Sequence, residues 1–291
     1  MLKKCRYIFS LLLIFTLGLE GHSLLYKVSS SENTVYIFGS IHLAKPELYP
    51  LDQVITKAYE NSDVLVVEVD PSSDESVSMM QEVMLNSGIY PSGMSLQTQL
   101  SEHTYGSLLE YANKRGLSMD EMQNMRPWVV MLQITVTEMM RLGYLPELGI
   151  DKYFLDKARA QNRPIVELET AAEQMALLSK DDEAFQDKLL LYTLESMTEL
   201  EPLLKSMFES WKKGDSNALE TIISLPLDED PSLQEVYDEL ITKRNYKMTD
   251  KIEGFLKTEK DYFVVVGSGH VIGREGIVEL LKARGFKVIQ K

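Results

Sequence analysis

The chain has 291 residues, of which 44% are hydrophobic, and its formal net charge is −14 at pH 7. This length allows one large domain or two small ones with a sizeable core. The acidic balance argues against a nucleic-acid partner, because phosphate binding needs a basic face and no basic stripe interrupts the sequence.

The N-terminus has the pattern of a secretory signal. Three basic residues precede an apolar run over 7–19, and small residues follow at Gly21 and Ser23. The run is shorter than the roughly 17–25 residues that a spanning helix needs. We therefore predict a signal peptide over 1–23, export to the periplasm or the extracellular space, and no membrane span after cleavage. Cys5, the single cysteine, precedes the apolar run, so the mature chain would have no disulfide.

Strands are predicted at the start of the mature chain. Residues 25–28 and 34–38 predict a hairpin across a polar turn, and a helix is expected near 50–60. The apolar run within 63–70 is typical of a strand that is covered on both faces.

The middle of the chain, 71–260, is predicted to be mostly helical and is rich in methionine. One strand is expected inside it at 164–168. Breaks between helices are expected at Pro202, at Gly214 and within 224–232, where proline and glycine interrupt the helical pattern.

The C-terminal end repeats the pattern of the N-terminal end. A strand at 262–266 is followed by a helix and a further strand. The units at 24–70 and 261–291 predict an α/β fold, in which a split repeat of β-loop-α-β units forms a central sheet with a large helical insertion. We assign 24–291 to a single domain.

The sequence Gly-Ser-x-His follows a predicted strand twice, ending at His42 and at His270. In open α/β sheets, sites form beyond the carboxyl ends of the strands. Gly39 and Gly267 allow the backbone to turn where a side chain would clash. One such histidine is most simply a core residue, but two in matched contexts favour a shared functional site. His103 is expected on the surface of a helix.

Acidic residues and one cation accompany the histidines. Glu68 stands in an apolar run, where a carboxylate is costly unless it is paired or bound to a metal. Asp70 is expected to be a turn residue or a helix cap. Glu167 and Glu169 are expected to cap a helix or to be solvated, although one of them could line the crevice. Arg244 lies on an amphipathic helix and, taken alone, predicts only a surface salt bridge.

Several blocks of the sequence, together with the two histidine motifs, are similar to the TraB/GumN family, whose animal members are called TIKI. The most specific block is 264–288, and "KRNYKM" at 243–248 precedes it. The blocks at 126–128, 149–151 and 166–178 resemble recurrent blocks of bacterial members. The resemblance spans nearly the whole mature chain.

This resemblance implies a peptidase that depends on a divalent metal, with two motif histidines, a glutamate and an arginine at its active site. In this sequence the matching positions are His42, His270, Glu68 and Arg244. The resemblance leaves the role of Arg126 open. Because one fold hosts many reactions, the fold alone does not fix the activity.

Metal-assisted hydrolysis is the leading hypothesis. His42, His270 and Glu68 would hold Mn²⁺, Co²⁺ or Zn²⁺, which imidazole and carboxylate ligands suit. The metal would lower the pKa of a bound water toward about 7 and polarise a scissile carbonyl. Arg244 would stabilise the oxyanion or hold a substrate carboxylate. If Glu68 is instead the general base, a residue such as Glu169 would complete the ligands.

Two other functions stay open. A metal-independent hydrolase with His42 as general base would be active in excess chelator. A non-catalytic protein that binds a peptide or a cofactor would show tight binding without turnover, with the methionine-rich middle as an adaptable groove. Ser40 and Ser268 are not expected to be nucleophiles, because the chain has no G-x-S-x-G elbow. The expected partner is a peptide or a small-molecule substrate.

Overall fold

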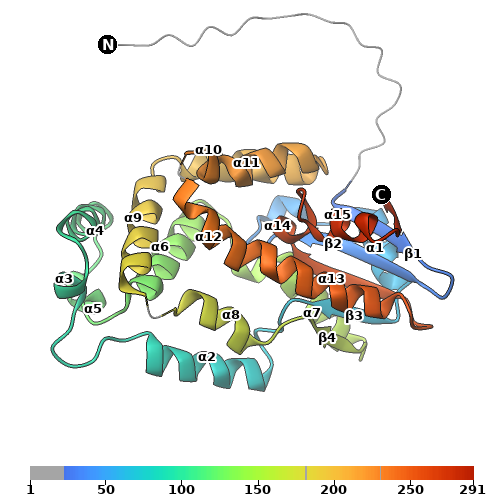
Figure 1. Ribbon diagram of the computed structural model, residues 1–291, viewed down its shortest axis with the longest axis horizontal. Helices are drawn as coiled ribbons and strands as arrows, with labels where there is room; N and C mark the ends of the chain where they lie inside the picture. The colour runs from blue at the N-terminus through green and yellow to red at the C-terminus, as the bar shows by residue number, and fades with distance from the viewer. Residues whose placement is uncertain (1–22, 181, 230) are drawn as a thin grey trace, which may run out of the picture.

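The computed structural model describes residues 23–180, 182–229 and 231–291. The predicted signal peptide lies outside the described residues, except for Ser23. A sheet occupies one end of the molecule and a helical region the other (Figure 1). None of the helices in the described part of the chain combines the length and the hydropathy of a membrane span.

Six strands form one mixed sheet, which confirms the α/β prediction. Their order is β4 (Ile165–Glu167), β3 (Val64–Val67), β5 (Tyr262–Gly267), β2 (Thr34–Ser40), β1 (Leu25–Ser29) and β6 (Lys287–Gln290). The hairpin of β1 and β2 is antiparallel, as predicted, and β6 pairs antiparallel with β1. The strands β2, β5, β3 and β4 run parallel.

The two histidine motifs follow neighbouring strands. In the parallel pair β2–β5, Gly39 is opposite Val266 and Ser40 is opposite Gly267. Parallel strands bring their carboxyl ends to the same edge of a sheet, so the two motifs meet although most of the chain separates them. The whole helical insertion lies between them in the sequence.

Helices cover both faces of the sheet. On one face, α1 (Gln53–Glu60) and α7 (Ile150–Ala160) place Tyr59 and Phe154 against Phe263, with ring centroids 5.6 and 4.8 Å away. On the other face, α13 (Lys243–Phe255) stacks Phe255 on Tyr262 at 4.6 Å. Successive strand residues point to opposite faces, so the two neighbours in β5 contact different helices.

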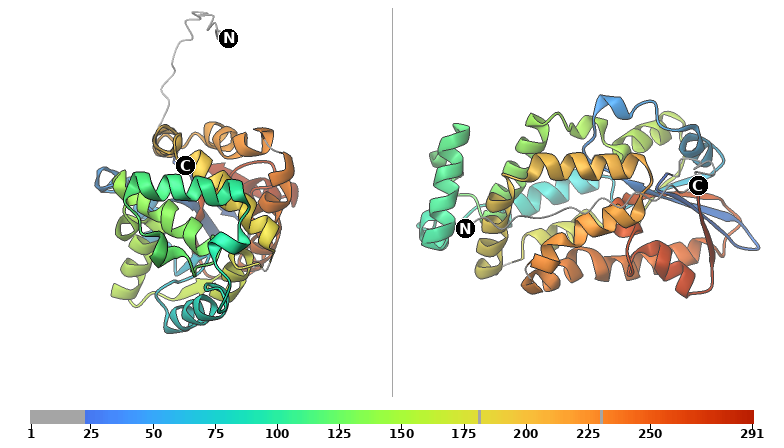
Figure 2. Two further views of the ribbon diagram at one scale, coloured as in Figure 1. Left: turned by 90° about the vertical axis from the view of Figure 1, so that its left-hand side faces the viewer. Right: turned by 90° about the horizontal axis from the view of Figure 1, so that it is seen from above.

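The insertion consists of helices that come before and after α7 in the sequence, and the right-hand view of Figure 2 shows them extending away from the sheet. Before α7 come α2 (Asp74–Ser87), α3 (Leu96–Gln99), α4 (Glu102–Arg115), α5 (Met119–Met122) and α6 (Pro127–Arg141). After β4 come α8 (Ala171–Leu178), α9 (Glu183–Ser196), α10 (Leu200–Lys212), α11 (Ser216–Glu229) and α12 (Gln234–Tyr237). A π-helical turn (Asp238–Thr242) joins α12 to α13, and α14 (Ser268–Val271) and α15 (Ile277–Ala283) follow β5.

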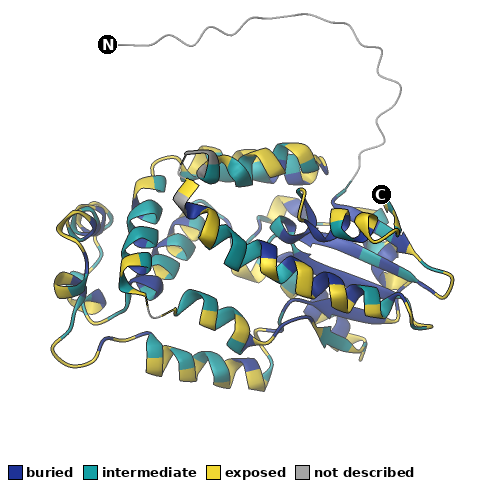
Figure 3. Cartoon of the chain, viewed as in Figure 1, coloured by how far each residue is buried: buried dark blue, intermediate teal, exposed yellow. Residues whose placement is uncertain are grey.

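The buried residues form two clusters. One surrounds the sheet, and Figure 3 shows its strands as largely buried. The second cluster lies among α4, α6 and α9, where Leu108, Val130 and Leu190 are fully buried. The insertion therefore has an apolar core of its own.

One predicted boundary is wrong. The strand expected over 63–70 ends at Val67, so Glu68 lies just beyond the strand rather than inside it. The break expected within 224–232 is confirmed, because α11 ends at Glu229, although Pro226 itself lies inside the helix. One proline removes a single helical hydrogen bond, and tertiary packing of the rest of the helix can outweigh that local cost.

Candidate active site

The two motifs are bonded to each other at the edge of the sheet. The Ser268 hydroxyl donates a hydrogen bond of 2.8 Å to the carbonyl oxygen of Ser40. A Cβ atom built on Gly39 would lie 3.2 Å from Ser268 Oγ, tighter than most real contacts. Glycine at position 39 therefore suits the close approach of the neighbouring motif. The bond from Ser268 to backbone agrees with a structural role for this serine.

Three predicted site residues surround Gly267. A Cβ atom built there would lie 3.3 Å from Glu68 Oε1, 3.4 Å from His42 Nε2 and 3.8 Å from His270 Cδ2. All three atoms lie within 3.8 Å of one point, so no two of them can be more than twice that distance apart. The structure thus brings both motif histidines and the glutamate to one small space. A side chain at position 267 would fill part of this space.

His270 is buried, and its tautomer is set by Asn245. The Nδ1 atom of His270 lies 2.7 Å from Asn245 Oδ1, while Asn245 Nδ2 donates to the Glu275 carbonyl at 2.8 Å. The amide oxygen therefore accepts a hydrogen from Nδ1, which leaves a lone pair on Nε2. This Nε2 lies 3.8 Å from Glu68 Oε2. Burial lowers the pKa of His270 to about 4, so the ring is neutral at pH 7.

His42 has a different environment. Its side chain is 60% exposed, and Nδ1 lies 2.9 Å from Asp151 Oδ2. The other Asp151 oxygen accepts a 2.8 Å hydrogen bond from the Ser40 hydroxyl. The charge of Asp151 raises the pKa of His42 to about 9. When the ring is neutral, the Nδ1–H donates to Asp151 and Nε2 has the lone pair, as in His270.

The sequence Gly-Ile-Asp explains how Asp151 reaches His42. A Cβ atom at Gly149 would lie 2.2 Å from the His42 carbonyl oxygen, so only glycine permits this approach. The Ile150 N–H donates to the Ile41 carbonyl at 3.1 Å. The start of α7 is thus fixed against the first motif, and Asp151 lies in its first turn.

Glu68 is held by donors on both oxygens. Its Oε1 accepts a 2.6 Å hydrogen bond from the Gly267 N–H, and its Oε2 accepts bonds from Arg244 Nη2 at 2.7 Å and Gln174 Nε2 at 3.2 Å. Burial alone would raise the pKa of Glu68. The histidines, Arg244 and the Gly267 N–H instead hold this pKa below its usual value, so the group is a carboxylate.

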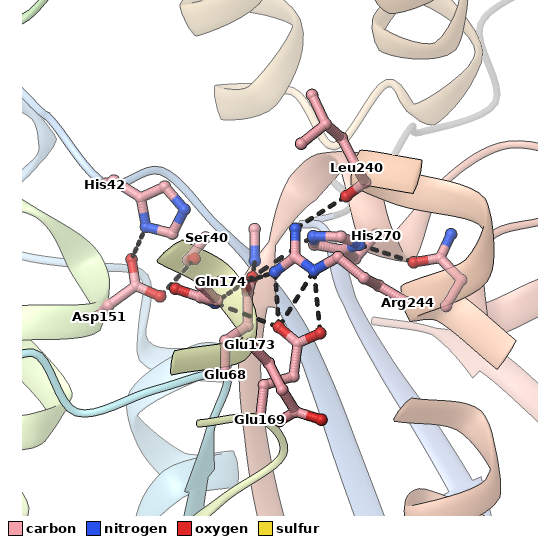
Figure 4. A network of polar contacts seen from close by, with 12 residues as sticks. Ser40, His42, Glu68, Asp151, Glu169, Glu173, Gln174, Leu240, Arg244 and His270 are labelled. Carbon is pink, nitrogen blue, oxygen red and sulfur yellow. Dashed lines mark hydrogen bonds and ion pairs between the residues drawn. The ribbon is translucent and has the colours of Figure 1, made fainter. Parts of the chain in front are cut away.

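Arg244 links two carboxylates (Figure 4). Its Nη2 donates to both Glu68 and Glu169 at 2.7 Å, and its Nε donates to Glu169 at 2.9 Å. Its Nη1 donates to the Leu240 carbonyl at 2.8 Å, within the π-helical turn that precedes α13. Such turns are frequent at functional sites. Arg244 therefore lies in the site, where most of its hydrogens hold acidic side chains.

The prediction that Glu169 caps a helix or is solvated is wrong. Glu169 is only 7% exposed, because it pairs with Arg244 at the end of β4. Its neighbour Glu167 accepts a 2.5 Å hydrogen bond from the Asp70 N–H. Asp70 itself accepts from the backbone N–H of Ser72, which is a turn interaction as predicted.

Two other candidate residues lie outside the site. Arg126 precedes α6 in the insertion, where its guanidinium lies 5.3 Å from the centroid of the Tyr90 ring. His103 is on α4 with a side chain that is 71% exposed, as expected for a surface helix residue.

Sequence reasoning did not find the groups that orient the site, namely Asp151, Asn245 and Gln174. Asp151 entered the sequence analysis only as part of the block at 149–151. For Asn245 a usable signal exists, because it lies three residues before Met248 on the buried face of α13. An amide on a buried helical face needs a partner.

The donor chemistry of the site suits a metal ion such as Zn²⁺, Mn²⁺ or Co²⁺. Both imidazoles have Nδ1 bonded to an oxygen acceptor, the usual arrangement of metal-ligating histidines. Oε1 of Glu68 accepts one hydrogen bond and keeps a lone pair, whereas Oε2 already accepts two hydrogen bonds. The spacing is wider than a closed ligand shell, since no group of three or more His, Cys, Asp or Glu residues among those described could hold a metal ion as they lie.

The chain is similar to known proteins over most of its length. The model of the TraB/PrgY/gumN family matches residues 24–290. The uncharacterized protein YbaP of Escherichia coli is 26% identical over 250 residues, which cover 85% of this chain and 87% of YbaP. Metalloprotease TIKI2 of Xenopus tropicalis is 24% identical over 306 residues, covering 87% of this chain and 57% of TIKI2.

Metalloprotease TIKI1 of the same frog is 23% identical, again over 87% of this chain and over 59% of its own length. No solved structure matches the chain significantly. The family match covers nearly every described residue, including both histidine motifs, Glu68 and Arg244. The chain belongs to the TraB/PrgY/gumN family.

Proposed function

We propose that the chain is a metal-dependent hydrolase that cleaves peptide bonds. One observation supports this most strongly: His42 Nε2, His270 and Glu68 lie around the same point beside Gly267. The names of the TIKI relatives, which are metalloproteases, support the same reaction class. Two imidazoles and a carboxylate are a ligand set typical of metallohydrolases.

In this proposal His42 and His270 hold the metal through Nε2, and Glu68 is the third ligand. The bound ion would polarise the scissile carbonyl and activate a water. Asp151 and Asn245 hold the two rings in the orientation that presents Nε2. Each of these contacts fixes a tautomer.

Arg244 has a separate task in the proposal. It orients Glu68 through Nη2 and balances the charge of Glu68 and Glu169. Its position beside the shared space also suits the stabilisation of negative charge on a substrate oxygen. Separate measurement of kcat and KM in an Arg244→Lys variant tests this role of Arg244.

The proposal includes export of the chain and removal of residues 1–23. The tripartite N-terminal sequence supports this part. Mass spectrometry of the protein isolated from a producing cell would show an N-terminus near Ser23. An N-terminus at Met1 in the protein from the cytoplasmic fraction alone would contradict export.

Hydrolysis of a fluorogenic peptide mixture tests the reaction class. We expect cleavage to stop in excess chelator and to return after addition of Zn²⁺, Mn²⁺ or Co²⁺. His42→Ala and His270→Ala should remove activity, whereas His103→Ala, at the exposed histidine of α4, is the matched control. Full activity in chelator would contradict metal dependence.

The His42–Asp151 pair favours one second candidate, a metal-independent hydrolase with His42 as general base. A histidine oriented by a carboxylate is a common general base. Because the pKa of His42 is raised to about 9, this base would act mainly at alkaline pH. Chelator-resistant activity that rises toward pH 9 would identify this candidate.

A further inference from the structure

Two cavities meet at His42. The larger has a volume of about 560 Å³ and contains Glu68, Arg244 and His270 at one end. Most of the rest of its wall is apolar, and its apolar residues include Met139, Leu204, Met207, Phe208, Ile223 and Leu240. Among the described residues that line this cavity, the site residues Glu68 and Arg244 are the only acid and the only arginine or lysine.

The second cavity has a volume of about 510 Å³ and also borders His42 and Glu68. Apolar side chains form much of its wall, including Val69, Met80, Val136, Leu155 and Met175. Its cations are already paired: Lys152 lies 2.7 Å from Asp156, and Arg159 is bonded to Asp70. The second cavity therefore offers mostly apolar contact as well.

The helix α6 borders both cavities. Met139 lines the larger cavity and Val136 the smaller, and these residues are three positions apart. That separation corresponds to about 4.5 Å along a helix axis, so the two cavities are neighbours. His42, Leu43 and Glu68 line both of them.

An extended peptide fits this arrangement. Successive side chains of an extended chain point to opposite sides, about 3.3 Å apart along the chain. A peptide whose scissile bond lies beside Glu68 would direct the two flanking side chains into different cavities. Pockets of about 300–1,000 Å³ with apolar walls are typical ligand sites.

We propose that the two cavities are subsites on either side of the scissile bond, and that both select apolar side chains. The 560 Å³ cavity takes a large apolar side chain, and the 510 Å³ cavity takes the apolar side chain across the bond. This inference rests on the proposed hydrolase function, since it names the substrate class of that same site.

Three tryptophan substitutions on α6 test the subsites. Met139→Trp reduces the larger cavity, and Val136→Trp reduces the smaller one. Met140→Trp is the matched control, because Met140 is the adjacent methionine and is 45% exposed. The full chain is assayed against peptides that carry leucine, phenylalanine, alanine or glycine on each side of one bond.

We expect each cavity variant to change the preference on one side of the bond only. Met139→Trp should lower kcat/KM for peptides with phenylalanine at the larger subsite by about tenfold. Val136→Trp should lower kcat/KM equally for peptides with phenylalanine on the other side of the bond. A misfit of one or a few methylenes has effects of this size. Met140→Trp should change neither. Met139→Ala and Val136→Ala enlarge the cavities and should shift the preference toward larger residues, so the test survives if the tryptophan variants do not fold.

Peptide binding in excess chelator separates this inference from the proposed reaction. Fluorescence anisotropy with the same labelled peptides measures subsite selectivity without cleavage. Selective binding of apolar peptides that are never cleaved would support the subsites and contradict the hydrolase. Cleavage without apolar preference, or a preference that none of the cavity variants changes, would overturn the subsites and leave the hydrolase standing.

Discussion

The two Gly-Ser-x-His motifs end neighbouring parallel strands, yet their histidines differ in almost every property. The His42 side chain is 60% exposed and is bonded to a carboxylate, whereas the His270 side chain is 6% exposed and is bonded to an amide. The charge of Asp151 raises the pKa of His42 to about 9, and burial lowers that of His270 to about 4. One local sequence thus gives two opposite electrostatic environments.

The difference comes from the helices on the two faces of the sheet. Asp151 belongs to α7, which covers one face, and Asn245 belongs to α13, which covers the other. The motif determines where each ring lies. Asp151 on α7 then raises the pKa of His42, whereas burial lowers that of His270. Glu68 borders the same small space as both rings.

Removal of the cation that both acids share should have the largest effect. Arg244→Ala leaves Glu68 and Glu169 buried without their counter-charge, so we expect a loss of about 3–5 kcal/mol in the free energy of unfolding and no activity. Urea unfolding measures the free energy of unfolding. Adding Glu169→Gln to Arg244→Ala should recover part of the stability. A loss below about 1 kcal/mol would show that the pair is weakly coupled to folding.

Substitutions at Asp151 and Asn245, the partners of the two rings, should make the pKa values of His42 and His270 more alike. Asp151→Asn removes the charge beside His42, and its pKa should fall from about 9 toward the ordinary 6.5. Asn245→Asp places a carboxylate beside His270, and its pKa should rise from about 4. NMR titration of the metal-free protein measures both pKa values. Unchanged values would mean that other groups set these environments.

Metal binding should release a proton from His42 but not from His270. At pH 7 the metal-free protein has His42 protonated and His270 neutral, since their pKa values are about 9 and about 4. A ligand must lose its proton, so metal affinity should rise with pH between 7 and 9. Calorimetry in buffers of different ionisation enthalpy should give about one proton per ion. Asp151→Asn should remove most of this release.

The pH dependence of stability should show the smallest effect, with opposite signs for the two histidines. A raised pKa in the folded state favours folding at low pH, so the contribution of His42 is complete below pH 6.5 and is lost as pH rises through about 9. A lowered pKa does the reverse, so His270 reduces stability as pH falls from 6.5 toward 4.

Chemical unfolding of the metal-free protein at several pH values measures these slopes. We expect the His42 contribution to be below about 1 kcal/mol because its ring is open to solvent. His42→Asn should flatten the slope between pH 6.5 and 9, and His270→Asn should flatten it between 6.5 and 4. If both variants changed the slope equally in the same pH range, the opposite pKa shifts of His42 and His270 would be contradicted.

Much of the sheet could be predicted from sequence because its strands are short apolar runs that end in glycine or acid. The repeated motif predicted that both ends of the chain form one central sheet, and β2 and β5 lie side by side in it. The continuation of α11 past Pro226 could not be predicted locally. It depends on packing with other elements, which overrides helix propensity.

The candidate site was predictable only in part. His42, His270 and Glu68 could be identified because each lies at the end of a predicted strand. A polar residue beside an apolar run is a signal that the sequence alone provides. The carboxylate partner Asp151 and the buried pairing of Glu169 depend on distant contacts, separated in sequence by 109 and 75 residues. No local pattern specifies such pairs, because they form only when the helices pack on the sheet.

Metal stoichiometry measured by elemental analysis tests most directly whether the two unlike histidines serve one site. The wild-type chain and His103→Ala should each bind one ion, and His42→Ala and His270→Ala should each lose it, because both rings border the same space beside Gly267. Full occupancy in either of the last two variants would show that the rings do not share an ion.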